Sequence, residues 1–535
     1  MLGSIPKHPD SIAAAFLESC ERSPDKPCII FDGRPYSYVD VRDVTLRWAG
    51  AFQAWGLRSG ERVALFLENS PSFVAAYLGI YLAGGIVVLV NTQYRQVELR
   101  HILNDAGVRF CVTDPPRRDE LARVLSDLPA LEAIVVVTER SGGRSGDRST
   151  DERAGLSSVV QRDAQEFLSD AKPLRVILPD AGTIALIGYT SGTTGRSKGA
   201  MLTHANLAAN SAAVTQAWHW TADDRLLLTL PLFHAHGLGV GMHGTLLVGG
   251  TADLRRRFDA AEVYDTLLEG RITMFFGVPT MYTRLIAEAK KRGRSPAPIR
   301  LYVSGSAPLS AQTFEEFERL FGQRILERYG MTETMMNLTN PYHGERRPGT
   351  VGQPFPGQEA RIVDVQTRQP IDDERPGEIQ VRGPHVFKGY WQRPDATAAA
   401  FDADGWFNTG DLGWRSADGY YTISGRAREL IISGGYNVYP REVEEVLLSH
   451  PGVVEAAVLG LPDPEFGEQV VAVVVRRPDA DAPTADALIA WCREQLAGFK
   501  KPRRVIFVES LPRNALGKIQ KHVLREQVEG VASGG

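Results

Sequence analysis

The sequence is poor in cysteine and carries almost no net charge, and both shortages exclude classes of protein. Only four of 535 residues are cysteines, and no two form a C-x-x-C pair. A zinc ribbon, a disulfide scaffold and a thioredoxin-like site are therefore not indicated, and we expect reduced thiols in a cytoplasmic protein. Lysine and arginine total 60 against 64 acidic residues, so the net charge is −4, which argues against a nucleic-acid binder.

We expect neither a signal peptide nor a membrane span in this sequence. Its first ten residues hold two prolines and no apolar run. Residues 73–90 are uncharged and just long enough to cross a bilayer, but Gly84-Gly85 divides them into FVAAYLGIYLA and IVVLV. The first part is typical of a buried helix and the second of a buried parallel strand. We therefore expect helix, turn and strand, with no membrane span.

Apolar segments alternate in type along the first four hundred residues. RVALFLE, RFCVTD and AIVVVTE are typical of strands, whereas VELRHILNDAG predicts a helix that ends at Gly107. Such alternation favours parallel sheets covered by helices, that is, the α/β class. Residues 138–155 are rich in Gly, Ser and charge and predict a mobile surface loop.

The pattern changes near residue 425. Beyond it, short strands (ELIISGG, VVEAAVLGL, QVVAVVV, RVIFVES) alternate with two helices (REVEEVLLSH, TADALIAWCREQLAGF). This mixture predicts a small separate domain of α+β character. We place a large N-terminal domain at residues 1–425 and the small domain at 426–535.

The richest local signal is the segment 184–199, IALIGYTSGTTGRSKG. An apolar strand leads into glycines, whose N–H groups can approach an anion closely, and hydroxyls that can donate hydrogen bonds to phosphate. Lys198 adds a point charge, but the loop is not a Walker A motif because Lys198 follows Ser197 and not glycine. A plain surface turn is the alternative. The predicted phosphate-binding residues are Thr190, Ser191, Gly192, Thr193, Thr194, Gly195 and Lys198.

This loop resembles the TSGTTGxPKG signature of the adenylate-forming acyl-CoA synthetases, a family that includes adenylation domains and luciferases. Ser197 stands where that signature has proline. Further strings of the family recur in the same order, namely ERYGMTET (327–334), GWFNTGDLG (405–413), GRARELIISGGYNVYPREVE (425–444) and PRNALGK (512–518). The resemblance implies a large domain of parallel-sheet α/β layers, a β-barrel-like subdomain, and a small α+β domain that rotates about a hinge at Arg428.

The resemblance also implies a reaction. A carboxylate attacks the α-phosphate of ATP to give acyl-AMP and pyrophosphate, and the thiol of CoA then attacks the acyl carbon. Positioning and electrostatics dominate such steps, and no Ser-His-Asp arrangement is evident. The implied cofactors are ATP, CoA and Mg²⁺, the implied partner is a small carboxylate, and the chain is expected to be a monomer or a homodimer.

By the same resemblance, the segment from Tyr329 and Gly330 to Glu333 holds the nucleotide. Tyr329 stacks on adenine, Thr332 contacts the α-phosphate, and Glu333 binds Mg²⁺. The alternative is a polar turn after a helix that ends in LERYG. Further implied residues are Asp411 and Arg426 on the ribose, Lys518 as the mobile catalytic lysine, Gly434, Gly435 and Tyr436 along pantetheine, and Gly305, Ser306 and Ala307 at a turn facing adenine and substrate. The alternative for Arg426 is a surface ion pair, and the alternative for Lys518 is a solvated lysine. For the Gly434 turn, it is a plain connection between a strand and a helix.

The acyl pocket is expected near PLFHAHG (231–237), where His234 orients the carboxylate and His236 is favoured as a structural histidine. VSGSAPL and ERYGMTETMMNLTNPYHGERRPGTVG resemble malonyl-CoA synthetases, in which an arginine and a serine matching Arg284 and Ser306 hold the distal carboxylate. Malonate, or methylmalonate, is therefore the predicted substrate. Arg284 pointing to solvent and a medium- or long-chain fatty acid are the alternatives. An amino-acid adenylation module is disfavoured, because no anionic anchor for an ammonium group is visible.

Overall fold

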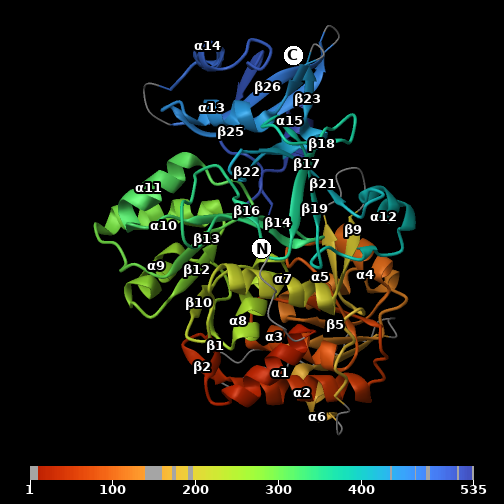
Figure 1. Ribbon diagram of the computed structural model, residues 1–535. Coiled ribbons are helices and arrows are strands. Elements are labelled where there is room, and N and C mark those ends of the chain that lie inside the picture. The colour runs from red at the N-terminus through yellow and green to blue at the C-terminus, as the bar shows by residue number, and fades with distance from the viewer. Residues whose placement is uncertain are drawn as a thin grey trace.

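The computed structural model in Figure 1 has a large N-terminal lobe and a smaller C-terminal lobe, drawn in blue, seated above it. It describes residues 10–138, 159–171, 176–190, 197–433, 436–463, 466–477, 482–514 and 517–532. The predicted mobile loop at 138–155 falls almost wholly outside these ranges. Among the described residues, no helix is long and apolar enough to cross a membrane.

Two large, mainly parallel sheets form the N-terminal lobe. The first has nine strands in the order β16-β15-β14-β13-β12-β10-β11-β1-β2. Its strands are β1 (Pro27–Phe31), β2 (Arg34–Ser37), β10 (Arg225–Leu228), β11 (Thr251–Leu254), β12 (Met274–Gly277), β13 (Leu301–Ser304), β14 (Leu326–Met331), β15 (Met335–Thr339) and β16 (Gln353–Pro354). The six strands from β14 to β1 in this order run parallel to their neighbours, with antiparallel strands at both ends.

The second large sheet has eight strands in the order β20-β9-β8-β4-β3-β5-β6-β7. They are β3 (Arg62–Phe66), β4 (Ile86–Leu89), β5 (Val108–Thr113), β6 (Ala133–Val136), β7 (Val160–Asp163), β8 (Ile184–Thr190), β9 (Lys198–Thr203) and β20 (Gly389–Tyr390). β8 runs parallel to β4 and antiparallel to β9, and residues 191–196 lie between these two strands in the sequence.

A third, antiparallel sheet occupies the place of the predicted barrel-like subdomain. Its order is β18-β17-β19-β21-β22, with β17 (Glu359–Val363), β18 (Pro370–Ile371), β19 (Gly377–Arg382), β21 (Phe407–Arg415) and β22 (Tyr421–Arg426). The C-terminal lobe has its own five-stranded sheet, made of β23 (Ile431–Ser433), β24 (Tyr436–Val438), β25 (Val453–Asp463), β26 (Gly467–Arg476) and β27 (Arg504–Phe507).

Helices cover the sheets in both lobes (Figure 1). Those of the N-terminal lobe are α1 (Ile12–Arg22), α2 (Tyr38–Ala54), α3 (Pro71–Leu82), α4 (Gln96–Ala106), α5 (Pro115–Ala122), α6 (Ala164–Ser169), α7 (His204–Ala217), α8 (His243–Val248), α9 (Ala260–Leu268), α10 (Pro279–Arg292), α11 (Ala311–Phe321) and α12 (Pro394–Ala400). The C-terminal lobe has α13 (Pro440–Leu448), α14 (Ala485–Gln495) and α15 (Lys521–Ala532). Short helical turns lie at η1 (Leu125–Asp127), η2 (His236–Met242) and η3 (Ala427–Glu429).

The predicted α/β class is confirmed, with a large parallel-sheet lobe and a smaller C-terminal lobe. The uncharged run at 73–90 is a helix, a turn and a strand: Gly84 takes a left-handed φ of 84° between α3 and β4. Every residue of α3 from Phe73 to Leu82 is buried, which explains its lack of charge. All four cysteines are free thiols, as expected.

One alternative considered for the ERYGMTET string is wrong. Leu326–Met331 does not end a helix but forms strand β14, paired with β13 on one side and with β15 on the other. The first four of these residues are buried, and the β-sheet pairing of Glu327 and Arg328 places two charged residues inside the lobe. The string is therefore the end of a buried strand, where ligands of α/β sheets commonly bind.

Candidate active site

The ends of β8 and β14 and the return strand β9 bring the predicted nucleotide residues together. Thr190 at the end of β8 pairs in register with Lys198 at the start of β9. The Lys198 ammonium lies 4.6 Å from the ring centre of Tyr390, whose hydroxyl donates a 3.0 Å hydrogen bond to Glu333. The residues between the strands, Ser191 to Gly195 among them, lie outside the described part of the chain.

Tyr329, Asp411 and Arg426 form a buried polar group beside this edge. The Tyr329 hydroxyl donates to one oxygen of Asp411, and Arg426 Nε lies 2.7 Å from the other. Asp411 and Arg426 face each other on β21 and β22, so sheet register alone sets their contact. The Asp411 carboxylate raises the pKa of Arg426, and burial, with Asp411 next, raises the pKa of Tyr329. The carboxylate oxygens of Asp411 carry lone pairs suited to accept hydrogen bonds from ribose hydroxyls.

Glu333 fits a magnesium ion that is shared with a polyphosphate. Its side chain is 6% exposed, and burial raises its pKa, so a nearby cation would favour the ionised form. No cluster of three His, Cys, Asp or Glu side chains suited to a metal occurs in the described ranges. One carboxylate plus substrate oxygens and water is a usual way of holding Mg²⁺, whereas a protein cage is not. Thr332, next to Glu333, packs its methyl group against Gly188 of β8.

Sequence reasoning missed Arg328, which the structure places against the predicted acyl pocket. Its side chain is 3% exposed, and neither Nε nor Nη2 has a hydrogen-bond partner within the described residues. The guanidinium packs so tightly on Gly305 that any side chain there would come within 2.5 Å of it. Burial lowers the pKa of Arg328 to about 9, which still leaves it cationic at neutral pH. Buried donors without partners are costly, so this group is suited to an anionic ligand.

Ser306 lies beside this arginine in a constrained backbone position. Its φ of 69° is left-handed, which is uncommon for a residue other than glycine. Its hydroxyl lies 3.3 Å from Nδ1 of His236, which is buried and whose Nε2 has no partner within the described residues. Gly305 and Ala307 complete the turn that follows β13. The predicted Gly305-Ser306-Ala307 turn therefore borders Arg328 and His236.

The structure places the other predicted substrate residue, Arg284, differently. It is exposed on α10, whereas Arg328 is buried. It lies one helical turn beyond Thr280, on the same side of α10. Thr280 in turn contacts Gly517 of the C-terminal lobe, because an added Cβ at Gly517 would lie 3.1 Å from the Thr280 hydroxyl oxygen. Arg284 therefore stands at the seam where the two lobes meet, and its role stays a prediction.

His234 connects the acyl pocket with the predicted catalytic lysine. Burial first, then the charges of Arg328 and Lys518, lower its pKa to about 4, so the imidazole is neutral at physiological pH. Lys518 thus lies within electrostatic reach of His234 although the two belong to different lobes. Its backbone N–H donates a 3.0 Å hydrogen bond to the Asn514 side chain, which closes the turn that carries it.

The predicted hinge lies between the two lobes. Arg428 falls in the short turn η3, between β22 and β23, and its side chain lies outside the described part of the chain. The next residue, Glu429, is 3.2 Å from the ammonium of Lys521, which also lies 2.7 Å from Glu444 of α13. Lys521 begins α15, three residues after Lys518. A single lysine therefore joins the hinge turn to the segment that follows the catalytic lysine.

The predicted pantetheine residues are described only in part. Gly434 and Gly435 lie outside the described ranges, and Tyr436 is 58% exposed, with its ring stacked on Phe499 at 4.6 Å. No nucleotide-site residue contacts this stack in the described structure. Their role toward CoA stays a prediction.

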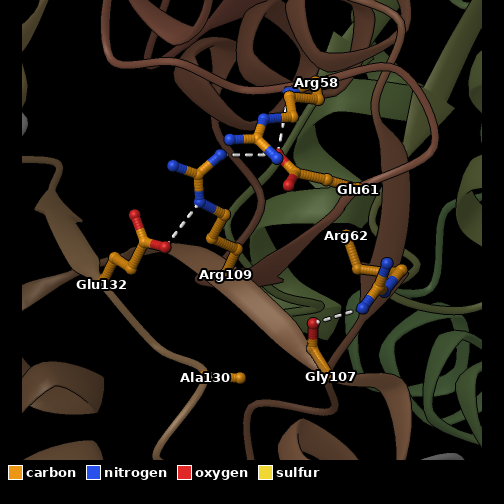
Figure 2. A pocket seen from close by; sticks show the side chains of 7 residues that line it. All are labelled: Arg58, Glu61, Arg62, Gly107, Arg109, Ala130 and Glu132. Carbon is orange, nitrogen blue, oxygen red and sulfur yellow. Dashed lines mark hydrogen bonds and ion pairs between the residues drawn. The ribbon is translucent and has the colours of Figure 1, made fainter.

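A polar pocket of about 300 Å³ lies apart from the site described above (Figure 2). Its charges pair with one another, since Arg109 lies 2.6 Å from Glu61 and 2.8 Å from Glu132. Arg62 donates to the carbonyls of Ala106 (2.6 Å) and Gly107 (2.8 Å), where α4 ends. The lining of this pocket therefore stabilises the end of α4 through Arg62.

Comparison with known proteins places the chain in a family. Residues 16–391 match the family described as AMP-binding enzyme, and residues 442–518 match the AMP-binding enzyme C-terminal domain. The chain is 35% identical to the malonate–CoA ligase of Arabidopsis thaliana, an alignment that covers 96% of this chain and 88% of that protein. It is 34% identical to a long-chain-fatty-acid–CoA ligase of Bacillus subtilis, over 98% and 96% of the two chains. The chain therefore belongs to the AMP-binding enzyme family.

Solved structures show the same relationship. ATP-bound MatB from Rhodopseudomonas palustris superposes with a TM-score of 0.86, at 38% identity and with 98% of this chain and 99% of that chain covered. The apo form of MatB covers the same shares of the two chains but superposes with a TM-score of 0.76. This chain therefore superposes better on the ATP-bound form of MatB than on the apo form.

Proposed function

We propose that this protein is an ATP-dependent malonate–CoA ligase, which forms malonyl-AMP and then malonyl-CoA, with release of pyrophosphate and AMP. The observation that carries the proposal is the buried guanidinium of Arg328, with two N–H groups that lack a partner in the described structure. A neutral acyl chain would leave those donors unsatisfied. A second carboxylate would accept both, in the bidentate geometry that guanidinium and carboxylate groups favour.

In the first half-reaction the protein supplies position and charge. Tyr329 stacks on the adenine, Asp411 and Arg426 hold the ribose, and Thr190, Lys198 and Thr332 contact the phosphates. Neutral His234 orients the reacting carboxylate toward the α-phosphorus. Lys518, brought in by the C-terminal lobe, offsets the negative charge that develops as the carboxylate oxygen bonds to phosphorus and pyrophosphate leaves. Mg²⁺ held by Glu333 would neutralise the departing pyrophosphate.

The second half-reaction needs a different arrangement of the lobes. Rotation about Arg428 withdraws Lys518 and turns the segment around Gly434, Gly435 and Tyr436 toward the acyl group. The sulfur of CoA then bonds to the acyl carbon, the bond between that carbon and the phosphate oxygen breaks, and AMP leaves with its electron pair. Domains at 1–425 and 426–535, a cytoplasmic location and a monomeric or homodimeric state belong to the same proposal.

A medium- or long-chain fatty acid is the second candidate substrate, favoured by the similarity to the Bacillus subtilis fatty-acid ligase. The physical argument against it is the cost of facing an unpaired arginine with methylene groups. Methylmalonate differs from malonate by one methyl group and keeps both carboxylates, so the same pocket argument applies to it.

A substrate panel tests the proposal. CoA-thioester formation is measured with malonate, methylmalonate, butyrate and octanoate at equal concentration, with and without ATP. We expect malonate or methylmalonate to exceed octanoate at least tenfold in kcat/KM, since a charge-assisted pair contributes about 1.5–3 kcal/mol. Arg284→Ala should lower malonate turnover without improving octanoate. A preference for octanoate would contradict the assignment, and full malonate activity in Arg284→Ala would show that Arg284 does not hold the distal carboxylate.

A further inference from the structure

Two side chains of α4 hold the two strands that flank residues 191–196. His101 Nε2 lies 2.8 Å from the carbonyl oxygen of Ser197, which immediately precedes Lys198. Asp105 accepts a 2.7 Å hydrogen bond from the hydroxyl of Tyr189, which immediately precedes Thr190. The two residues are four apart on α4 and therefore lie on one face of the helix. His101 and Asp105 are therefore each hydrogen-bonded to a residue adjacent to a predicted phosphate ligand.

The His101 contact fixes the tautomer of the ring. A carbonyl oxygen can only accept a hydrogen bond, so Nε2 must carry the hydrogen that is donated to Ser197. The donor is present in both the neutral and the protonated imidazole.

The helix that carries these residues is itself firmly attached. Arg62 donates to the two carbonyls at its end, Ala106 and Gly107. Figure 2 shows the contact with Gly107. Asp105 forms a second contact through its other oxygen, 2.6 Å from the guanidinium of Arg393. The indole of Trp391 donates a 3.0 Å hydrogen bond to the Asp105 carbonyl, and the Trp391 N–H donates to Gly199 in β9. Hydrogen bonds through Trp391 therefore connect α4 to β9.

Ser197 is the position at which this sequence departs from the signature it resembles, TSGTTGxPKG. Proline fixes its own φ near −65° and restricts the residue before it. Serine imposes neither restriction, so the backbone before Lys198 has more freedom than a proline would allow. The hydrogen bond from His101 supplies a restraint at the same residue.

We propose that His101 is a positioning residue for ATP: its bond to the Ser197 carbonyl holds the backbone at Lys198 in the conformation that binds the β- and γ-phosphates. His101 does not touch the substrate and acts through Ser197. The inference rests on the role proposed above for Lys198. Asp105 holds strand β8 at Tyr189. Residues on both sides of the segment 191–196 are therefore hydrogen-bonded to a single helix, α4.

The two half-reactions separate this role from a general structural one. The β- and γ-phosphates are present when malonyl-AMP forms and have left, as pyrophosphate, when CoA attacks. His101→Leu should therefore raise the KM for MgATP about fivefold, the factor that corresponds to one hydrogen bond. The rate at which CoA reacts with supplied malonyl-AMP should stay within about twofold of wild type.

Rescue makes the test specific to the Ser197 carbonyl. The double variant His101→Leu/Ser197→Pro should recover most of the affinity for MgATP, because proline replaces the lost restraint. His101→Gln, whose amide can donate to the same carbonyl, should also keep a KM close to wild type. Val97→Ala, at a residue of α4 that is 74% exposed, is the matched control and should change neither half-reaction.

An unchanged KM for MgATP in His101→Leu would overturn the proposal. So would an equal loss in both half-reactions, or a double variant and a His101→Gln variant that are no better than His101→Leu. Malonate-dependent ligation by the wild-type enzyme is measured in the same experiment, so a failure of the proposed function is distinguishable from a failure of the role of His101.

Discussion

Gly517 of the C-terminal lobe packs closely against Thr280 at the start of α10: an added Cβ would lie 3.1 Å from the Thr280 hydroxyl oxygen, tighter than an ordinary contact. This contact joins the turn that carries Lys518 to the helix that carries Arg284. It accounts for the influence of the Lys518 charge on the pKa of His234. In this arrangement of the lobes, Lys518 lies within electrostatic reach of His234, as the proposed first half-reaction needs.

Loss of Lys518 should affect one half-reaction only. Lys518→Ala should lower the rate of malonyl-AMP formation about a hundredfold or more, because a preorganised charge at the reacting phosphate is removed. Thioester formation from supplied malonyl-AMP should remain within about threefold. Pyrophosphate release and malonyl-CoA formation are measured separately, with Lys290→Ala on the outer surface of α10 as the control. Equal losses in both steps would contradict the assigned role.

Arg328 should determine the choice between a second carboxylate and an apolar chain. Arg328→Met should lower kcat/KM for malonate by about ten- to a hundredfold and leave butyrate unchanged or improved. Thermal stability should not fall, because a buried guanidinium whose Nε and Nη2 lack hydrogen-bond partners among the described residues is replaced by an apolar side chain of similar length. Equal losses for malonate and butyrate would indicate a structural role, and unchanged malonate turnover would remove Arg328 from the pocket.

Tyr390 should support Glu333 through its hydroxyl and Lys198 through its ring. Tyr390→Phe keeps the aromatic face and removes the 3.0 Å hydrogen bond to Glu333. We expect the KM for MgATP to rise about tenfold, as is typical for a bond to a charged group. Tyr420→Phe, whose hydroxyl contacts a surface carbonyl at Glu345, is the matched control. A KM equal to that of wild type would show that Glu333 does not depend on this contact.

The ionisation of His234 should cause no step in the pH profile of kcat/KM above pH 5. Burial and two neighbouring cations lower its pKa to about 4, so it is neutral above that pH and becomes charged only as the pH falls through it. The profile of kcat/KM for malonate should therefore have the same shape in His234→Gln as in wild type between pH 5 and 8. A step near pH 6.5 that disappears in the variant would show a histidine of ordinary pKa.

Lys521 should matter to both half-reactions, in contrast to Lys518. Its ammonium joins Glu429 of the hinge turn to Glu444 of α13. Lys521→Met leaves two partly buried carboxylates without their cation and should loosen the hinge in both arrangements. We expect malonyl-AMP formation and thioester formation each to fall about tenfold, with partial recovery in Lys521→Arg. Loss of the first step alone would place Lys521 with the catalytic turn and not with the hinge.

Much of this site could be predicted because its parts are contiguous in sequence. The strand before the phosphate segment, the turn after β13 and the hairpin that carries Asp411 and Arg426 each follow from local pattern or motif. The division of residues 73–90 into helix and strand followed from Gly84, whose left-handed conformation the structure confirms.

The remainder depends on contacts between distant segments. Arg328 stands inside a quoted motif, yet a charge in LERYGM gave no sign of burial until β14 was found between β13 and β15. Tyr390 and His101 lie in segments with no recognisable motif, and only the pairing of β9 with β20 and the packing of α4 bring them to the phosphate segment. Whether Arg284 or Arg328 meets the distal carboxylate could not be decided from spacing along the chain.

Isotope transfer tests the central claim most directly. Malonate labelled with ¹⁸O in both carboxylates is incubated with the enzyme, MgATP and CoA, and AMP, pyrophosphate and malonyl-CoA are examined by mass spectrometry. If a malonate carboxylate attacks the α-phosphorus, each AMP carries one labelled oxygen, pyrophosphate carries none, and malonyl-CoA forms in equal amount. Unlabelled AMP, or label in a phosphate released with ADP, would contradict the account.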